Sequence, residues 1–292
     1  MKYTNKFNLP SVLEKALTRS DYKRSLVDKR YSVTSLLQSP REYFISRRHD
    51  DEVTVDITEN INKFIGNAIH AELESCGKDT GLNVVERYMS VKLNEYTLTG
   101  KLDIYNGDTI SDYKTVTIYS FNDPDMDYYT KQVNMYLYML RKTDPEVAKN
   151  IKKLNVVLIC KDWSKTKAGD DENYSQSPIK VIDLKMFSIE EQEAAILKRL
   201  NYFDECSKMN DNSLPLCTRE EMFQDKNDRY EVWGEGNKRA SHIAINESEA
   251  SEWINNSKSK SKYSIKIVEP RKTKCLYYCN ASEFCNQYKT NK

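Results

Sequence analysis

Apolar residues recur every three or four positions along several segments, and this periodicity predicts amphipathic helices. The clearest stripe runs over 58–76 and consists of Ile61, Phe64, Ile65, Ala68, Ile69 and Leu73. Gly66 lies within this stripe, and because a glycine lowers helix stability, we expect another backbone to approach closely there. The same periodicity predicts two further helices, over 126–142 and 189–202.

Alternating apolar and polar residues, bounded by turn residues, predict strands elsewhere in the chain. Three of them form a predicted meander over 84–93, 96–105 and 109–119. The last two are joined by Asn106-Gly107-Asp108, and an Asn-Gly step is a strong hairpin signal. Further strands are predicted over 155–160, 179–186, 230–233, 242–245 and 263–268. Strands interleaved with helices predict an α/β fold with a mixed central sheet flanked by helices.

The length of 292 residues suits one main domain with appended segments. The formal net charge of +1 gives no sign of a polyanion partner, although acidic and basic regions can cancel. The sequence contains no apolar run of about 18 residues and no signal-peptide pattern, so we expect a soluble, cytoplasmic protein without membrane association. Seven cysteines, an odd number, argue against a disulfide framework.

Two acids and a lysine come together in the predicted hairpin. Asp103 lies near the end of one strand, and Asp112 and Lys114 are two residues apart on the next, so these two project from the same face. Two carboxylates can hold one or two Mg²⁺ or Mn²⁺ ions, with the backbone carbonyl of Tyr113 as a further ligand. A metal-activated water beside a lysine is what phosphodiester hydrolysis requires. The alternative is a surface hairpin in which Lys114 pairs with a carboxylate.

Two helical motifs flank this hairpin along the chain. Upstream, Gly66-x-x-x-His70 spans one turn of a predicted helix, and downstream Gln132 and Tyr136 share a face of the next helix. Other roles are open to these residues. His70 could be a satisfied core histidine, and Gln132 and Tyr136 could be ordinary helix surface and core.

With these motifs in place, the chain resembles the RecB-like branch of the PD-(D/E)XK nuclease superfamily. In that branch a helix with Gly-x-x-x-His is followed by a strand ending in Gly-x-x-Asp, a strand with (Asp/Glu)-x-Lys and a helix with Gln-x-x-x-Tyr. Within residues 30–160 the four motifs occur in this order, as Gly66 to His70, Gly100 to Asp103, Asp112 to Lys114 and Gln132 to Tyr136. The resemblance implies a restriction-endonuclease-like core.

The resemblance also implies a role for each motif residue. The residues it implies as metal ligands are His70, Asp103 and Asp112. Lys114 would be the catalytic lysine, while Gln132 and Tyr136 would contact DNA near the scissile phosphate, or contact the catalytic lysine. Glu86 matches a position that is often acidic in this branch.

Three cysteines crowd near the C-terminus in the spacing Cys275-x-x-x-Cys279-x-x-x-x-x-Cys285. Three thiolates need a fourth ligand to complete a tetrahedral metal site or a cubane cluster. RecB-like nucleases with such a triplet carry a [4Fe–4S] cluster, whose first ligand lies near the N-terminus just before a Pro-Arg step. Ser39 stands at that place here, and the best substitute is Cys217. Zn²⁺ at the same cysteines and three unliganded thiols are the alternatives.

Two residues are candidates for further contacts with DNA. Arg41 belongs to a basic cluster, and Trp163 lies between Lys161 and Lys165, where its ring could stack on a base.

These observations predict three parts of the chain, namely an N-terminal helical segment over 1–57, a nuclease core over 58–205 and a C-terminal, cysteine-stapled segment over 206–292. The resemblance implies a metal-dependent deoxyribonuclease, an exonuclease on single strands or DNA ends in phage or bacterial recombination, repair or replication. The alternative is a catalytically dependent subunit, or a DNA-binding scaffold, of a helicase or recombination complex. The sequence has no Walker-type glycine-rich loop, so a motor would be a separate chain.

Overall fold

The structure, a computed structural model, describes residues 1–19, 29–79, 84–224, 229–257 and 262–289. Its contacts divide the chain into two compact units. The first unit consists of Met1–Pro40 and Asp50–Met209, and the second of Arg41–His49 and Asn210–Lys292. These boundaries differ from the three expected parts, because most of the N-terminal segment belongs to the first unit while residues 41–49 belong to the second.

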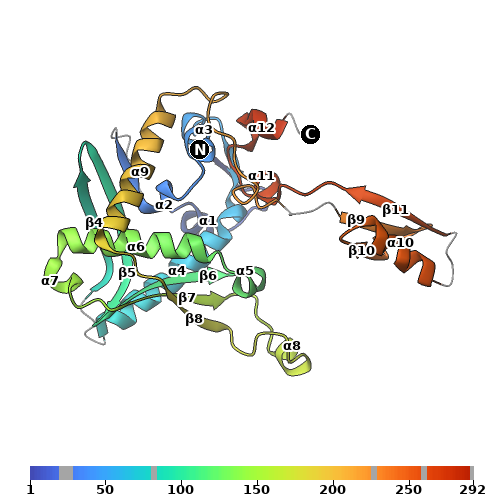
Figure 1. Cartoon of the computed structure of the whole chain (residues 1–292), viewed down its shortest axis with the longest axis horizontal. Coiled ribbons are helices and arrows are strands. Elements are labelled where there is room, and N and C mark those ends of the chain that lie inside the picture. The colour runs from blue at the N-terminus through green and yellow to red at the C-terminus, as the bar shows by residue number, and fades with distance from the viewer. Residues whose placement is uncertain (20–28, 80–83, 225–228, 258–261, 290–292) are drawn as a thin grey trace. The chain divides into compact units, whose positions relative to one another are not determined.

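A mixed sheet forms the centre of the first unit (Figure 1). Its strands, in spatial order, are β2 (Arg30–Ser32), β5 (Tyr96–Asn106), β6 (Thr109–Val116), β7 (Lys153–Cys160) and β8 (Ile179–Leu184). A further strand, β4 (Val84–Leu93), pairs with β5. The β2–β5 and β6–β7 pairs are parallel, and the β4–β5, β5–β6 and β7–β8 pairs are antiparallel. The predicted α/β fold with a mixed central sheet is confirmed.

The hairpin between β5 and β6 forms where the sequence predicts it. Asn106 pairs with Thr109, and Gly107 takes a φ of 63°, in the left-handed region that favours glycine. β6 ends at Val116, earlier than the predicted end at 119, because the chain turns there into the short helix α5 (Ile118–Asn122).

Three long helices pack in the first unit, and two of them, the second and third along the chain, begin at a side-chain cap. α4 (Ile61–Asp79) follows the 3₁₀ turn η1 (Ile57–Asn60), which Asp56 caps. α6 (Met126–Thr143) starts after Asp125, and α9 (Ile189–Ser207) after Ser188. α6 lies over the sheet and contributes fully buried apolar side chains to the core (Figure 1). The close approach expected at Gly66 is wrong, since a Cβ there would meet nothing within 4 Å.

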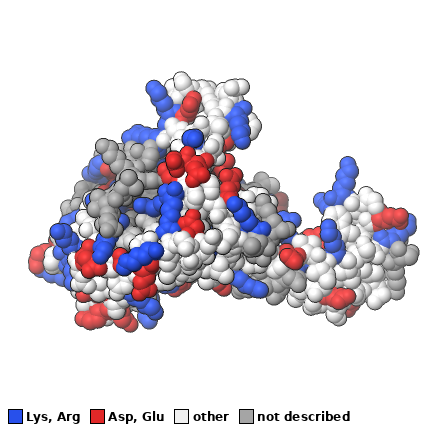
Figure 2. Space-filling model, turned by 90° about the horizontal axis from the view of Figure 1, so that it is seen from above, with Lys and Arg blue, Asp and Glu red and all other residues white. Residues whose placement is uncertain are grey.

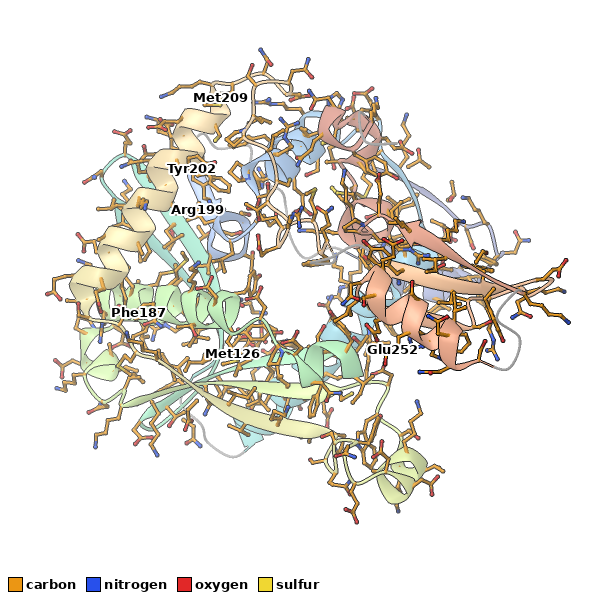
Figure 3. The ribbon with its side chains drawn as sticks, turned by 45° about the vertical axis from the view of Figure 1, so that its right-hand side comes forward. Met126, Phe187, Arg199, Tyr202, Met209 and Glu252 are labelled. Carbon is orange, nitrogen blue, oxygen red and sulfur yellow. The ribbon has the colours of Figure 1, made fainter. Side chains whose placement is uncertain are left out.

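The helix α9 is fastened to the short helix α2 (Val33–Leu36) by Arg199 (Figure 3). Its Nε donates to the carbonyl of Leu36 at 2.5 Å, and its guanidinium lies 4.9 Å from the ring centroid of Phe203. The remaining elements of this unit are β1 (Lys2–Thr4), α1 (Ser11–Thr18), β3 (Thr54–Asp56), α7 (Pro145–Ala148) and α8 (Lys165–Asp170). β1 pairs with β3 in a separate two-stranded sheet.

The second unit contains the small sheet that the sequence predicts. β9 (Arg229–Gly234) lies between β10 (His242–Ala244) and β11 (Tyr263–Val268), all antiparallel. The helix α10 (Glu247–Asn256), which the polar sequence did not predict, packs on this sheet over a small core of Val232, Ala244 and Ala250. The other elements are α3 (Pro40–Arg48), α11 (Thr273–Tyr277), η3 (Ser282–Phe284) and α12 (Asn286–Lys289).

Charges of both signs are mixed over the molecular surface that Figure 2 shows, in keeping with the net charge of +1. Within the part of the chain that the structure describes, every helix is too short or too polar to span a bilayer.

Candidate metal and catalytic site

The site begins where β5 and β6 separate. Their paired register ends at Ile104 and Ser111. One step further on, the backbone N–H of Tyr113 donates to Oδ2 of Asp103 at 2.9 Å. A carboxylate therefore accepts the hydrogen bond that a carbonyl of the neighbouring strand would otherwise accept. This contact fixes the Asp103 side chain between the two strands.

Three side chains from different elements meet beside this gap. His70 on α4, Glu86 on β4 and Asp103 on β5 each offer one ligand atom, and these atoms lie within 4.8 Å of one another. His70 Nδ1 lies 3.1 Å from Glu86 Oε1 and 3.7 Å from Asp103 Oδ1. One imidazole nitrogen with two carboxylates is a donor set that suits a divalent cation such as Mg²⁺ or Mn²⁺.

The backbone at Glu86 is strained in a way that serves this arrangement. Glu86 has a φ of 54°, which a non-glycine residue inside a strand rarely adopts. Such strain concentrates at functional sites, because the surrounding structure must hold it in place. Here the strained residue is the one whose carboxylate contacts His70 and belongs to the candidate ligand set.

The second carboxylate of the hairpin lies against the lysine that follows it. Asp112 is 1% exposed, and its Oδ2 lies 2.5 Å from Nζ of Lys114. Burial alone would lower the pKa of Lys114, but the charges of Asp112 and Asp103 raise it above its ordinary value. Lys114 therefore carries a positive charge beside Asp112.

The buried acids of the site repel one another. Burial, followed by the charge of Asp112, raises the pKa of Asp103 to about 7. Burial would also raise the pKa of Glu86, but hydrogen bonds with His70 and Lys101 together hold it below its ordinary value. A divalent cation would relieve the repulsion between the buried carboxylates.

Lys101 is a residue of this site that the sequence reasoning missed. Its Nζ forms an ion pair with Oε2 of Glu86. The signal was present in the sequence, since Lys101 precedes Asp103 by two residues on one strand and therefore shares its face. The role of Glu86 was anticipated only through the resemblance.

Gln132 and Tyr136 do lie on one face of α6, as predicted, and Gln132 Nε2 donates to the Tyr136 hydroxyl at 3.0 Å. They are 3% and 4% exposed. Their burial does not fit the predicted direct contact with DNA, because neither side chain reaches the surface. Oε1 of Gln132 has no hydrogen-bond partner among the described residues, which leaves a buried acceptor on this helix.

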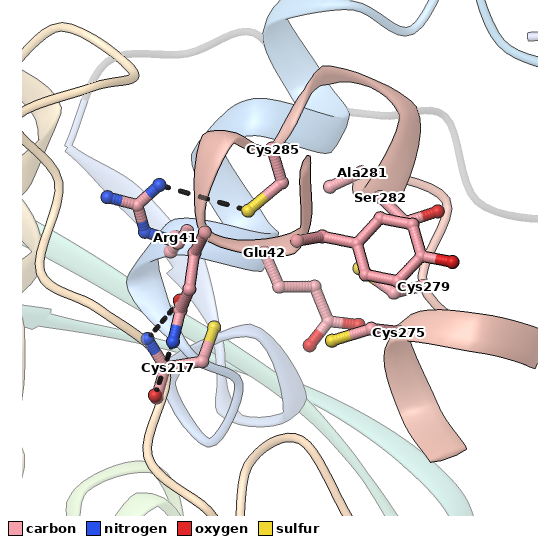
Figure 4. A pocket seen from close by; sticks show the side chains of 10 residues that line it. Arg41, Glu42, Cys217, Cys275, Cys279, Ala281, Ser282 and Cys285 are labelled. Atoms are coloured by element: carbon pink, nitrogen blue, oxygen red, sulfur yellow. Dashed lines mark hydrogen bonds between the residues drawn. The ribbon is translucent and has the colours of Figure 1, made fainter. Parts of the chain in front are cut away.

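The predicted DNA contact of Arg41 is wrong, because Arg41 is only 1% exposed. Its guanidinium donates to the carbonyls of Pro215 and Leu214 and to Oδ1 of Asn286. It also lies 3.8 Å from the sulfur of Cys285 (Figure 4). The guanidinium of Arg41 therefore has its hydrogen-bond acceptors within the second unit.

The four cysteines predicted as ligands line one pocket of the second unit. Its lining includes Cys217, Cys275, Cys279 and Cys285 together with Arg41 and Glu42 (Figure 4). Gln287 holds the Cys217 segment by accepting from its N–H at 2.8 Å and donating to its carbonyl at 2.9 Å. Burial raises the pKa of Cys279 to about 12 and also raises that of Cys275. A metal would have to displace the thiol protons when it binds.

Trp163 is half-buried, and its indole N–H donates to the carbonyl of Ser175 at 2.7 Å. This bond orients the ring in the segment after β7, and stacking on a base stays a prediction. The same holds for the Tyr113 carbonyl as a metal ligand.

No family model matches the chain, and no curated protein matches it. Three solved structures are similar at low identity. SSO0001 has 16% identity and a TM-score of 0.43, over 65% of this chain and 81% of that chain. A candidate exonuclease from Eubacterium rectale has 14% identity and a TM-score of 0.33, over 68% and 74%. A phage-related exonuclease from Haemophilus somnus 129PT has 13% identity and a TM-score of 0.28, over 69% and 92%. At these TM-scores the similarity carries no argument for function, which has to come from the site.

Proposed function

We propose that this chain is a metal-dependent nuclease that hydrolyses phosphodiester bonds in DNA. The observation that carries the proposal is the meeting of His70, Glu86 and Asp103 within 4.8 Å. The ion pair between Lys114 and the buried Asp112 supports it. The motif order that resembles RecB-like nucleases extends the proposal from phosphodiesters in general to DNA.

Each residue of the site would have its own role in the hydrolysis. A bound Mg²⁺ or Mn²⁺ would activate a water and stabilise negative charge on the phosphate. His70, Glu86 and Asp103 would hold the ion, with Asp112 as a further carboxylate ligand. Lys114 would orient the attacking water and neutralise charge on the phosphate, and Asp112 positions its ammonium.

The test is cleavage of end-labelled DNA with Mg²⁺ or Mn²⁺, comparing wild type with Lys114→Ala and Asp112→Ala. Each variant should lose at least about 100-fold in rate, as expected when a charged group at a reacting phosphate is removed. Lys149→Ala is the matched control, since Lys149 is an exposed lysine that pairs with Glu146 on α7. It should cleave like wild type. Equal cleavage by the Lys114 variant would refute the proposed role of the site.

The choice of DNA substrate tests the mode of action. As an exonuclease on single strands or DNA ends, the enzyme should degrade linear DNA and leave a covalently closed circle intact. A wild-type protein that binds DNA but cleaves none of these substrates would favour the alternative, a subunit or scaffold that works with a helicase or recombination protein. The setting that we propose is intracellular recombination, repair or replication in a bacterium or phage.

We also propose that the second unit holds a [4Fe–4S] cluster through Cys217, Cys275, Cys279 and Cys285. The resemblance to RecB-like nucleases with a C-terminal cysteine triplet favours iron–sulfur over Zn²⁺, and all four cysteines line the same pocket. Arg41 would donate towards a ligand sulfur, a contact that tunes such clusters.

Iron, sulfide and zinc analysis of anaerobically purified protein tests this second proposal. Cys217→Ser and Cys285→Ser should lower the iron and sulfide content, while Cys76→Ser, which changes an exposed thiol on α4, should leave it unchanged. Zinc without sulfide would refute the cluster and establish the alternative metal.

A further inference from the structure

Glu86 is held by two partners at once. His70 Nδ1 lies 3.1 Å from its Oε1, and Nζ of Lys101 forms an ion pair with its Oε2. Each carboxylate oxygen of Glu86 thus has a side-chain partner in the structure. A metal ion that binds Glu86 has to take the place of a partner, and the two partners differ in how easily they leave.

His70 belongs to the same ligand set, so a metal ion would draw it in rather than expel it. Lys101 carries a positive charge and no lone pair to offer, so it cannot share the oxygen with a cation. Its side chain is 46% exposed, whereas that of Glu86 is 9% exposed. The lysine therefore has an open path into solvent on a flexible stem, and the carboxylate does not.

We propose that the ammonium of Lys101 occupies the metal site as a stand-in for the ion, paired with Glu86. A divalent ion displaces this ammonium from Glu86, and the released ammonium then binds a backbone phosphate of the substrate. The proposal rests on the proposed nuclease function. In the metal-free protein the ammonium neutralises a nearly buried carboxylate, whose burial without a partner would be costly. When the ion takes over that neutralisation, the released ammonium stands beside the site, two residues from Asp103 on the same strand.

A purely structural ion pair would behave differently. If Lys101 only stabilised β5 against β4, its removal would lower stability and would either weaken metal binding or leave it unchanged. Displacement makes the opposite prediction, because removing a competitor tightens binding. The sign of the change in metal affinity therefore separates the two roles.

The first measurement is titration of the DNA-free protein with Mn²⁺, followed by calorimetry or by the electron paramagnetic resonance of the free ion. Lys101→Met should bind Mn²⁺ about two- to fivefold more tightly than wild type, the upper part of the range expected for loss of one partly exposed ion pair. Lys101→Arg keeps the competing charge and should bind like wild type. Lys92→Met is the matched control, since Lys92 is an exposed lysine on β4 whose loss removes the same formal charge.

Unchanged or weaker Mn²⁺ binding by Lys101→Met would overturn the proposal while leaving the nuclease function standing. The same tightening in Lys92→Met would overturn it too, because general electrostatics would then explain the effect. If neither wild type nor any variant binds Mn²⁺, the metal site itself fails, and the proposed function fails with it.

The second measurement follows the released lysine. DNA affinity is measured by fluorescence anisotropy in a Lys114→Met background, which blocks cleavage, across a range of salt concentrations. With Mg²⁺ present, adding Lys101→Met should weaken binding and reduce the salt slope by about 0.7–0.9, the value for one phosphate contact. With chelator in place of metal, Lys101→Met should change neither quantity, because Lys101 is then paired with Glu86. An equal effect with and without metal would refute the exchange.

Discussion

Gly100 and Gly66 should respond to the same substitution with opposite signs. A Cβ at Gly100 would lie 2.9 Å from Cε1 of Tyr136 and 3.2 Å from Sδ of Met139. Both neighbours are buried on α6, and the Tyr136 hydroxyl is tied to Gln132, so neither side chain can move aside cheaply. A Cβ at Gly66 would meet nothing within 4 Å.

The magnitudes follow from this geometry. Overpacking a core in this way costs about 1–3 kcal/mol. The reduced freedom of the unfolded chain returns about 0.4–1 kcal/mol, so Gly100→Ala should destabilise by about 0.6–2 kcal/mol. Alanine has a higher helix propensity than glycine, and its Cβ at position 66 would meet no neighbouring atom. Gly66→Ala should therefore stabilise the protein by about 0.5–1 kcal/mol.

Urea unfolding followed by circular dichroism measures both variants, and an unchanged m-value shows that the midpoint reports stability alone. The two midpoints should move in opposite directions from wild type. If Gly100→Ala were as stable as wild type or more so, α6 could not lie against β5 as described, and the buried placement of Tyr136 would fall with it.

Three further outcomes follow from particular contacts. A hydrogen bond from the Thr58 hydroxyl, first among several, lowers the pKa of Asp56 to about 2 from an ordinary 3.8. Wild type should therefore melt at a higher temperature than Asp56→Asn, and this difference should be at its full size above pH 3.8. The difference in melting temperature should vanish as the pH falls through about 2, and a difference that stays constant with pH would contradict this. Arg199→Ala should cost about 1–3 kcal/mol in urea unfolding by leaving the Leu36 carbonyl without its donor, and Arg199→Lys should not restore the loss. Val232→Ala, in the small core of the second unit, should cost about 1–3 kcal/mol there and speed proteolysis near α10, while a uniform effect on cleavage throughout the chain would count against separate units.

Much of the fold could be predicted because its local signals agree with its packing. The alternation on β5 matches a largely buried strand, and the Asn-Gly turn matches the hairpin. The stripe on α4 predicted the helix itself, but its apolar side chains are half-buried or exposed in the structure. The helix α10 was missed because its sequence is polar, with Ala250 as its one fully buried side chain. Such a helix depends on its Asn246 cap and on a small sheet that local patterns describe poorly.

The site was predictable where spacing carries the information. Two-residue spacing brings Asp112 and Lys114 together, and the structure has them in contact. Spacing could not reveal that Glu86 adopts a left-handed backbone, since no sequence signal requires it there. Spacing also could not show that Arg41 is buried rather than on the surface, because its hydrogen-bond partners lie far along the chain.

The placement of residues 41–49 has a consequence for synthesis of the protein. A ribosome releases this helix long before the carbonyl of Pro215 and the side chain of Asn286, which accept hydrogen bonds from the Arg41 guanidinium. The second unit therefore cannot complete its folding until residue 286 has emerged. A gene fragment that starts after residue 209 would encode most of this unit but lack residues 41–49, which include Arg41. Separate expression of the two units therefore calls for a rearranged gene that joins residues 41–49 to the C-terminal portion.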